Sequence, residues 1–120
     1  MDANVDLRSR LERYYRLVDA GAYEEMLSLF HPEIVYERDG HPTITGADGM
    51  RSFYLGDRKI ASGRHIVEVI IADEDWAVAK GSFAGTLRDG SEVVVAFADF
   101  HKFSAGLICR RYTFFAGRAI

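Results

Sequence analysis

An aspartate lies inside a strongly apolar stretch of the chain, VVVAFADFHKF at residues 93–103. Because the side chains of a strand alternate between two faces, Asp99 shares one face with Val95, Phe97 and His101. A carboxylate in such surroundings must be paired, hydrogen-bonded or protonated, since isolated burial would cost several kcal/mol. We therefore expect Asp99 to be either a buried acid satisfied by a backbone amide or an arginine, or a functional acid inside a pocket.

Two histidines are the other titratable candidates. His101 lies two residues from Asp99, about 7 Å along the strand, so it could relay a proton through a water molecule or the substrate. The alternative is a core histidine bonded to a backbone carbonyl. His65 follows Gly63 and Arg64 at the start of a strand, where it could line the mouth of a pocket. The four histidines show no ligand spacing, so a metal site is possible but unsupported, and none is predicted.

The N-terminal half has the periodicity of helices. Asp6 can cap a first helix whose apolar residues recur at intervals of four, three and four, and Gly21 lies where a C-terminal glycine would end that helix. Two further helices are expected over Tyr23–Phe30 and Ala47–Leu55. Pro32 ends the earlier of these two, because the residue before a proline avoids helical geometry.

From Gly63 onward the pattern has a period of two, which is typical of strands. Strands are expected over residues 34–38, 65–72, 76–87, 93–103 and 107–115, with a loop over residues 39–45. Asp89-Gly90 predicts a hairpin, and Gly81 and Gly85 predict bulges in a curved strand. Helices followed by a meander indicate an α+β fold. In it, three N-terminal helices pack on the concave face of a curved antiparallel sheet, which forms a cone open at one mouth. Such a hollow would suit a small ligand.

Length and composition limit the classes of function. The 120 residues make one domain, 1–120, and the 48% of hydrophobic residues suffices for a core. A net charge of −3, with both signs interspersed, gives no reason to expect a nucleic-acid partner. No apolar run approaches the roughly 18–20 residues of a membrane span. The N-terminus has no hydrophobic signal segment, so we expect a cytoplasmic protein.

Three stretches resemble a known superfamily: ERYYRLVDAGAYEEMLSLFHPEIVYE, TGADGMRSFY and FADFHKFSAGLI. They are similar to the nuclear transport factor 2-like superfamily, and within it to the ketosteroid isomerases and SnoaL-like polyketide cyclases. The similarity covers nearly the whole chain. It indicates the fold more than the reaction, because this scaffold hosts isomerases, cyclases, dehydratases, epoxide hydrolases and plain binding modules.

The resemblance assigns roles to three residues. The isomerase mechanism uses an aspartate base and an oxyanion hole made of a tyrosine and a protonated aspartate. Tyr14 matches the oxyanion tyrosine and Asp99 the oxyanion acid, whereas the position of the base holds Arg38. A guanidinium within about 4–6 Å lowers a carboxyl pKa by roughly 1–3 units. Asp99 would therefore be ionised if Arg38 shares its cavity, and that mechanism would be disfavoured.

An Arg–Asp–Tyr cluster suits an aldol-type cyclase, which needs no cofactor. Arg38 would bind a carbonyl or carboxylate of the substrate, Asp99 would act as acid or base, and Tyr14 or Tyr36 would donate to an oxyanion. We therefore expect a cofactor-free cyclase or isomerase that acts on a hydrophobic, polyketide- or steroid-like carbonyl compound. A non-catalytic binding or carrier module on the same fold is the alternative.

The candidate site residues follow from this hypothesis. The catalytic candidates are Asp99, Tyr14, Arg38 and His101. The residues expected to line the pocket are Tyr36, Phe53, Tyr54, His65, Phe97, Arg110, Tyr112 and Phe114. Of these, Arg110 is assigned an inward direction because it shares strand parity with Tyr112 and Phe114. The resemblance also implies a homodimer. The outer sheet face would form its interface, since it presents Val94, Ala96, Ala98 and Phe100.

Overall fold

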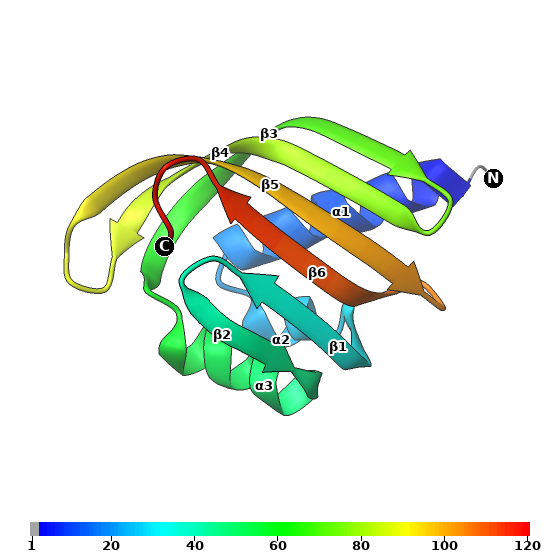
Figure 1. Ribbon diagram of the computed structural model, residues 1–120, viewed down its shortest axis with the longest axis horizontal. Coiled ribbons are helices and arrows are strands. Elements are labelled where there is room, and N and C mark those ends of the chain that lie inside the picture. The colour runs from blue at the N-terminus through cyan, green and yellow to red at the C-terminus, as the bar shows by residue number, and fades with distance from the viewer. Residues whose placement is uncertain (1–2) are drawn as a thin grey trace.

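The computed structural model describes residues 3–120, with side chains from Asp6 onward, as three α-helices, one π-helical turn and six strands (Figure 1). In chain order, the elements are α1 (Ala3–Asp19), α2 (Tyr23–Leu27), β1 (Phe30–Arg38), β2 (His41–Thr45), α3 (Gly46–Ser52), η1 (Phe53–Asp57), β3 (Ile60–Asp73), β4 (Trp76–Leu87), β5 (Glu92–Ser104) and β6 (Leu107–Phe115). The α+β class is confirmed. No helix in the described part of the chain is long and apolar enough to cross a membrane.

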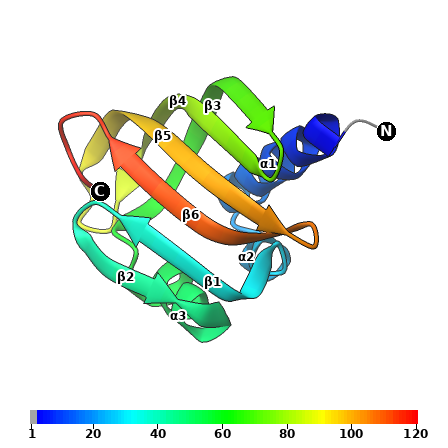
Figure 2. The ribbon, with the colours of Figure 1, turned by 45° about the vertical axis from the view of Figure 1, so that its right-hand side comes forward.

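The six strands form one sheet in the order β2-β1-β6-β5-β4-β3. All neighbours are antiparallel except β1 and β6, which run parallel (Figure 2). The expected purely antiparallel sheet is therefore wrong. The local pattern reveals only sequential hairpins, whereas the parallel pair joins strands that lie far apart in the chain. The sheet has two edges, β2 and β3, so it is not closed.

Helix α1 packs against the sheet face that carries Asp99. The predicted helical stripe is confirmed, since Leu7, Leu11, Tyr14 and Val18 are all buried. Burial of such side chains contributes roughly 1.5–3 kcal/mol each. The chain leaves the helix through a glycine with a φ of 72°, as the Gly21 signal predicted.

The boundaries of the shorter elements differ from those predicted. Helix α1 begins at Ala3, so Asp6 is not its cap but pairs with Arg10 at 3.0 Å along the helix. Helix α2 ends at Leu27 because β1 already begins at Phe30. Helix α3 ends at Ser52, where η1 takes over.

Residues 41–45, predicted to be a loop, form β2 instead. The preceding Gly40 has a φ of 77°, which permits the tight turn from β1 into β2.

The glycines of β4 let the backbone of β3 approach closely. A Cβ at Gly81 would overlap the Ile66 carbonyl, and one at Gly85 would overlap that of Ser62. The irregularities fall on β3, between Val67 and Val69 and near its start, and not on β4 as predicted. The glycines thus act by giving space to the irregular neighbouring strand.

The alternation of β5 is confirmed, but that of β6 is shifted. Val95, Phe97, Asp99 and His101 are all buried. On β6, the register against β5 shifts so that Cys109 is an extra residue. This bulge inverts the alternation beyond it, because one inserted residue exchanges the two faces. The predicted inward direction is therefore wrong for three residues, which lie on the outer face: Arg110, Tyr112 and Phe114.

Candidate functional site

Asp99 lies at the centre of a buried polar network. Its side chain is 2% exposed. The Oδ1 atom accepts a hydrogen bond from the Thr113 hydroxyl at 2.7 Å. The Oδ2 atom accepts one from the Tyr15 hydroxyl at 2.5 Å and one from Nη2 of Arg111 at 3.0 Å. Two hydroxyls and a guanidinium therefore satisfy the carboxylate.

The electrostatics of the network keep Asp99 ionised. Burial by itself would raise the pKa of Asp99, but the Arg111 guanidinium, together with His101 and the hydroxyl hydrogen bonds, brings that pKa down to about 2. The sequence predicts an ionised Asp99 beside Arg38. The structure contains a buried ion pair at Asp99, but Arg38 is not its partner. Arg111 takes that place because the bulge turns it inward.

Arg111 also connects Asp99 to a pair of tyrosines. Its Nη1 donates to the Tyr54 hydroxyl at 2.8 Å, and Tyr54 is hydrogen-bonded to the hydroxyl of Tyr14. Burial raises the pKa of Tyr14 well above its ordinary value, so this tyrosine is neutral. The resemblance implies that Tyr14 and Asp99 together form an oxyanion hole. In the structure, the Tyr14 hydroxyl is bonded to Tyr54, and it is Tyr15 that donates a hydrogen bond to Asp99.

His101 uses both ring nitrogens within the core. Its Nε2 accepts from Nε of Arg111 at 3.2 Å, and its Nδ1 donates to the Ala77 carbonyl at 3.2 Å. Burial and the charge of Arg111 lower the pKa of His101 to about 3. A neutral imidazole with its hydrogen on Nδ1 fits both contacts. The geometry thus favours the alternative of a core histidine, which here positions Arg111.

Arg38 contacts the C-terminal segment of the described chain. Its Nε and Nη2 both donate to the backbone oxygen of Ile120, at 2.9 and 2.7 Å. Its Nη1 donates to the Tyr36 hydroxyl at 2.7 Å, and Tyr36 lies 2.7 Å from the hydroxyl of Thr113. Arg38 therefore reaches Asp99 only through two intervening hydroxyl groups.

A cavity of about 20 Å³ lies among these groups. That is room for about one water molecule. Six of the predicted residues line this cavity: Tyr14, Arg38, Tyr54, His65, Phe97 and Asp99. Four residues that were not predicted also line it: Arg58, Arg111, Thr113 and Ile120. Of the other six predicted residues, Tyr36, Phe53 and His101 are buried but do not line this cavity. Arg110, Tyr112 and Phe114 lie on the outer face of the sheet.

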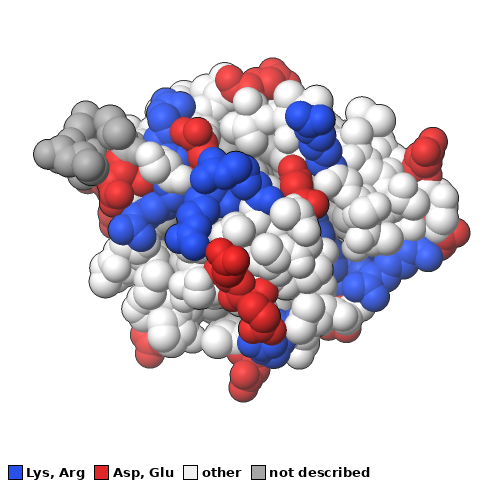
Figure 3. All heavy atoms as spheres, turned by 180° about the vertical axis from the view of Figure 1, so that it is seen from behind, with Lys and Arg blue, Asp and Glu red and all other residues white. Residues whose placement is uncertain are grey.

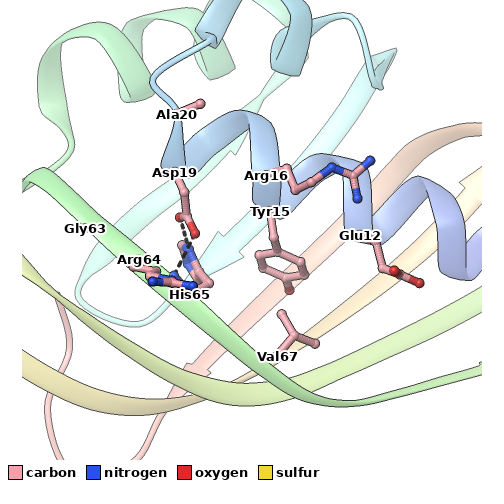
Figure 4. A pocket seen from close by; sticks show the side chains of 9 residues that line it. All are labelled: Glu12, Tyr15, Arg16, Asp19, Ala20, Gly63, Arg64, His65 and Val67. Atoms are coloured by element: carbon pink, nitrogen blue, oxygen red, sulfur yellow. Dashed lines mark hydrogen bonds and ion pairs between the residues drawn. The ribbon is translucent and has the colours of Figure 1, made fainter.

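A larger groove of about 590 Å³ lies outside the cavity, between α1 and β3 (Figure 4). Its lining is of mixed charge and includes Glu12, Arg16, Asp19 and Arg64. On the face seen from behind in Figure 3, basic and acidic side chains likewise lie next to one another. His65 lines both the groove and the buried cavity, so it forms part of the wall between them.

His65 forms a dyad with Asp19 at the end of α1. The Nδ1 atom lies 2.6 Å from Oδ1 of Asp19, and the backbone N–H of His65 donates to Oδ2 at 2.8 Å (Figure 4). The ring packs between Tyr15, Phe83 and Phe97, with centroid separations of 5.1, 4.8 and 5.3 Å. Nδ1 thus donates to a carboxylate, and the three aromatic rings together with Asp19 fix the orientation of the imidazole.

Sequence reasoning placed His65 at the pocket but missed Asp19. The two residues are 46 positions apart, so no local spacing connects them. One signal was available. Asp19 is the last residue of α1, where the helix dipole disfavours a negative charge. An acid at such a position indicates a partner elsewhere in the fold.

Residues that could hold a metal ion are lacking in the part of the chain that the structure describes. No group of three or more histidine, cysteine, aspartate and glutamate side chains comes together there. The arrangement offers instead one dyad of histidine and carboxylate, one ionised buried aspartate, and several neutral tyrosines beside guanidinium groups.

Comparisons with known proteins agree with the fold. A family model described as "SnoaL-like domain" matches residues 11–111. No curated protein is significantly similar to the chain.

Solved structures of similar fold include three bacterial proteins. A nuclear transport factor 2-like protein of unknown function from Exiguobacterium sp. 255-15 is 23% identical, with a TM-score of 0.78 over 91% of this chain and 99% of that one. A candidate SnoaL-like polyketide cyclase from Jannaschia sp. CCS1 is 11% identical, with a TM-score of 0.83 over 96% and 88%. A candidate ketosteroid isomerase from Kribbella flavida is 21% identical, with a TM-score of 0.79 over 96% and 81%.

Proposed function

The chain belongs to the SnoaL-like domain family, and from that premise we propose that it is a cofactor-free enzyme of the cyclase or isomerase kind. In this proposal, Nε2 of His65 removes a proton from the carbon next to a carbonyl group of a small hydrophobic compound. The reaction takes place in a cone-shaped pocket between the helices and the sheet.

The observation that carries the proposal is the dyad of His65 and Asp19. With Nδ1 donating to Asp19 at 2.6 Å, the lone pair of His65 lies on Nε2. The carboxylate stabilises the imidazolium that forms when Nε2 accepts a proton. Because His65 lines the groove as well as the wall of the cavity, a substrate bound in the groove, or in the cavity once its wall has opened, would lie beside this side chain.

Asp99 is a weaker candidate for the base. Three donors already bind its oxygens. Its pKa of about 2 means that it holds a proton poorly at neutral pH. An ionised Asp99 also cannot donate a hydrogen bond to an enolate, as the steroid isomerase mechanism requires. We assign it the role of holding Arg111 in place.

Tyr14 is the proposed donor to the oxyanion. Arg111 donates to the Tyr54 hydroxyl, which can in turn donate to Tyr14. The Tyr14 hydrogen is then free to bind an enolate oxygen in the cavity that it lines. In an isomerase, His65 would return the proton to another carbon; in a cyclase, the enolate carbon would attack a second carbonyl group.

A carrier or binding module is the second candidate function. The small volume of the cavity favours it, because a space of about 20 Å³ holds no substrate until the wall opens. The outcomes of one experiment distinguish the two candidates.

The experiment measures exchange of the proton next to the carbonyl of 2-tetralone, in heavy water, by proton NMR. The wild-type protein should accelerate this exchange, and His65→Gln should reduce the acceleration by roughly 10²–10⁴-fold, the usual contribution of a general base. Asp19→Asn should also reduce it, whereas the surface variant His31→Gln should match the wild type. Binding of the ketone without accelerated exchange would favour the carrier, and equal exchange in His65→Gln and wild type would refute the role of the dyad.

We also propose that two copies associate through the outer sheet face. This face exposes large apolar side chains, among them Val94 at 79%, Phe114 at 50% and Phe100 at 39%. Phe100 and Phe114 contact each other edge to face, with centroids 5.9 Å apart. A contiguous apolar patch on a sheet is typical of a symmetric interface.

A further inference from the structure

We infer that the buried cavity binds the carboxylate group of its ligand between Arg38 and Arg58. The natural ligand is then a small hydrophobic carboxylic acid. As a statement about substrate, this inference rests on the proposed function, but as a statement about binding it stands on the charges and contacts of the cavity.

The first argument is the balance of charge. Three guanidinium groups line the cavity, but Asp99 has the one carboxylate side chain among the lining residues. Asp99 is paired with Arg111 at 3.0 Å, and both side chains are almost fully buried. The other two guanidinium groups, on Arg38 and Arg58, form no ion pair with a carboxylate side chain in the described part of the chain. Arg38 is already bonded to the backbone oxygen of Ile120 and to the Tyr36 hydroxyl, whereas the Arg58 side chain has a buried donor without a partner. A buried charge without a counter-charge is costly, so an anion is expected to join Arg58.

The second argument is an unsatisfied donor on Arg58. This side chain is 5% exposed, and its Nε is a buried nitrogen without a hydrogen-bond partner, the one such side-chain atom among the described residues. The guanidinium lies 5.4 Å from the centre of the Tyr54 ring, which holds it at the cavity. A ligand oxygen would supply the missing acceptor.

The third argument is the geometry at Arg38. Two of its nitrogens, Nε and Nη2, converge on one oxygen, the backbone oxygen of Ile120, at 2.9 and 2.7 Å. A guanidinium binds a carboxylate oxygen through the same pair of N–H groups. The Ile120 oxygen thus occupies the position that we assign to an oxygen of the ligand.

Residues 116–120 form the cover that the ligand displaces. Ile120 is 5% exposed and forms part of the cavity wall. The segment is anchored where the Ala116 N–H donates to the Ala96 carbonyl at 3.0 Å, and Gly117 next to it has a φ of 83°. A change in the backbone dihedral angles of Gly117 would move Ile120 away from Arg38. This movement would free Nε and Nη2 of Arg38 and enlarge the cavity.

The test compares two probes of equal shape and different charge. Benzoate and benzamide are titrated by calorimetry into the wild type, Arg58→Gln and the surface variant Arg88→Gln, which loses the same formal charge. The wild type should bind benzoate at least tenfold more tightly than benzamide. Arg58→Gln should lose at least tenfold in benzoate affinity, and Arg88→Gln should stay within twofold of the wild type.

Several results would overturn the inference. They are equal affinity for the two probes, no benzoate binding by the wild type at millimolar concentration, and unchanged benzoate binding by Arg58→Gln. Chloride or phosphate that displaces benzoate at equal concentration would show a site for inorganic anions instead. Arg58→Lys keeps the charge and should retain part of the affinity, so it controls for folding if Arg58→Gln is unstable.

The proposed function is tested separately by His65→Gln. That variant keeps Arg38 and Arg58, so it should keep the preference for benzoate over benzamide, even if the altered cavity wall changes the affinity for both probes alike. A protein with the carboxylate preference but without proton exchange would keep the inference and refute the proposed base. Proton exchange without a carboxylate preference would do the reverse.

Discussion

Lowering the pH from 7 to 5 should destabilise the protein by about 2 kcal/mol through His101 alone. His101 is fully buried, and its pKa in the folded protein is about 3. In an unfolded chain, a histidine has a pKa of about 6.5. Between these two pKa values, the unfolded chain binds a proton that the folded protein does not bind. The free energy of unfolding therefore falls as the pH falls, by about 1.4 kcal/mol for each pH unit once the pH is well below 6.5.

The assay is urea unfolding of the wild type and of His101→Gln at pH 5, 7 and 8. Glutamine does not titrate, and its amide oxygen can accept the hydrogen bond from Nε of Arg111 that Nε2 of His101 accepts at 3.2 Å. The variant should therefore lose about 2 kcal/mol less than the wild type between pH 7 and pH 5. Between pH 7 and 8, where histidine is mostly neutral in both states, the unfolding free energies of the two proteins should change almost in parallel, to within a few tenths of a kcal/mol.

If the unfolding free energies of the two proteins fell equally between pH 7 and pH 5, this reasoning would be refuted. His101 would then be protonated in the folded state, and its Nε2 would be a donor. The hydrogen bond from Arg111 to Nε2 could not exist, and the network around Asp99 would have to be rearranged.

Three further perturbations test other parts of the structure. Asp99→Asn leaves the buried Arg111 without its counter-charge and should destabilise the protein by about 3–5 kcal/mol, so an unchanged melting temperature would contradict the ion pair. Gly81→Ala should cost about 1–3 kcal/mol in chemical unfolding because its Cβ meets the backbone of β3, whereas Gly56→Ala, which points into open space, should cost much less. Replacing both Val94 and Phe100 by lysine should convert the proposed dimer into a folded monomer in light scattering, and a parent protein that is already monomeric would refute the interface.

The sequence was sufficient for the fold class and for the order of the long elements, because both depend on local periodicity. The stripe of α1, the alternation of β5 and the hairpin at Asp89-Gly90 are all local patterns, and the structure contains each of them. The resemblance to the superfamily added the arrangement of these elements, and the match over residues 11–111 supports it.

The candidate site was predicted less well, because it depends on contacts between distant segments. One bulge at Cys109 exchanges the faces of β6 and brings Arg111, not Arg110, beside Asp99. No residue type announces such a bulge, so alternation could not reveal it. The dyad of Asp19 and His65 joins the end of a helix to the middle of a strand, which only the folded chain brings together.

The parallel pairing of β1 with β6 also determines when the chain can reach its native form. The ribosome makes β1 and β2 early, but β6, which joins β1 to the rest of the sheet, begins only at Leu107. β1 and β2 therefore stay detached from the main sheet until nearly all of the residues up to Phe115 have been synthesised. Arg111 and Thr113 arrive on that same late strand, which leaves Asp99 without two of its donors until the strand inserts. Insertion of β6 is therefore expected to be the slow, final step of folding, since among the strand pairs of the sheet its pairing with β1 closes the longest loop.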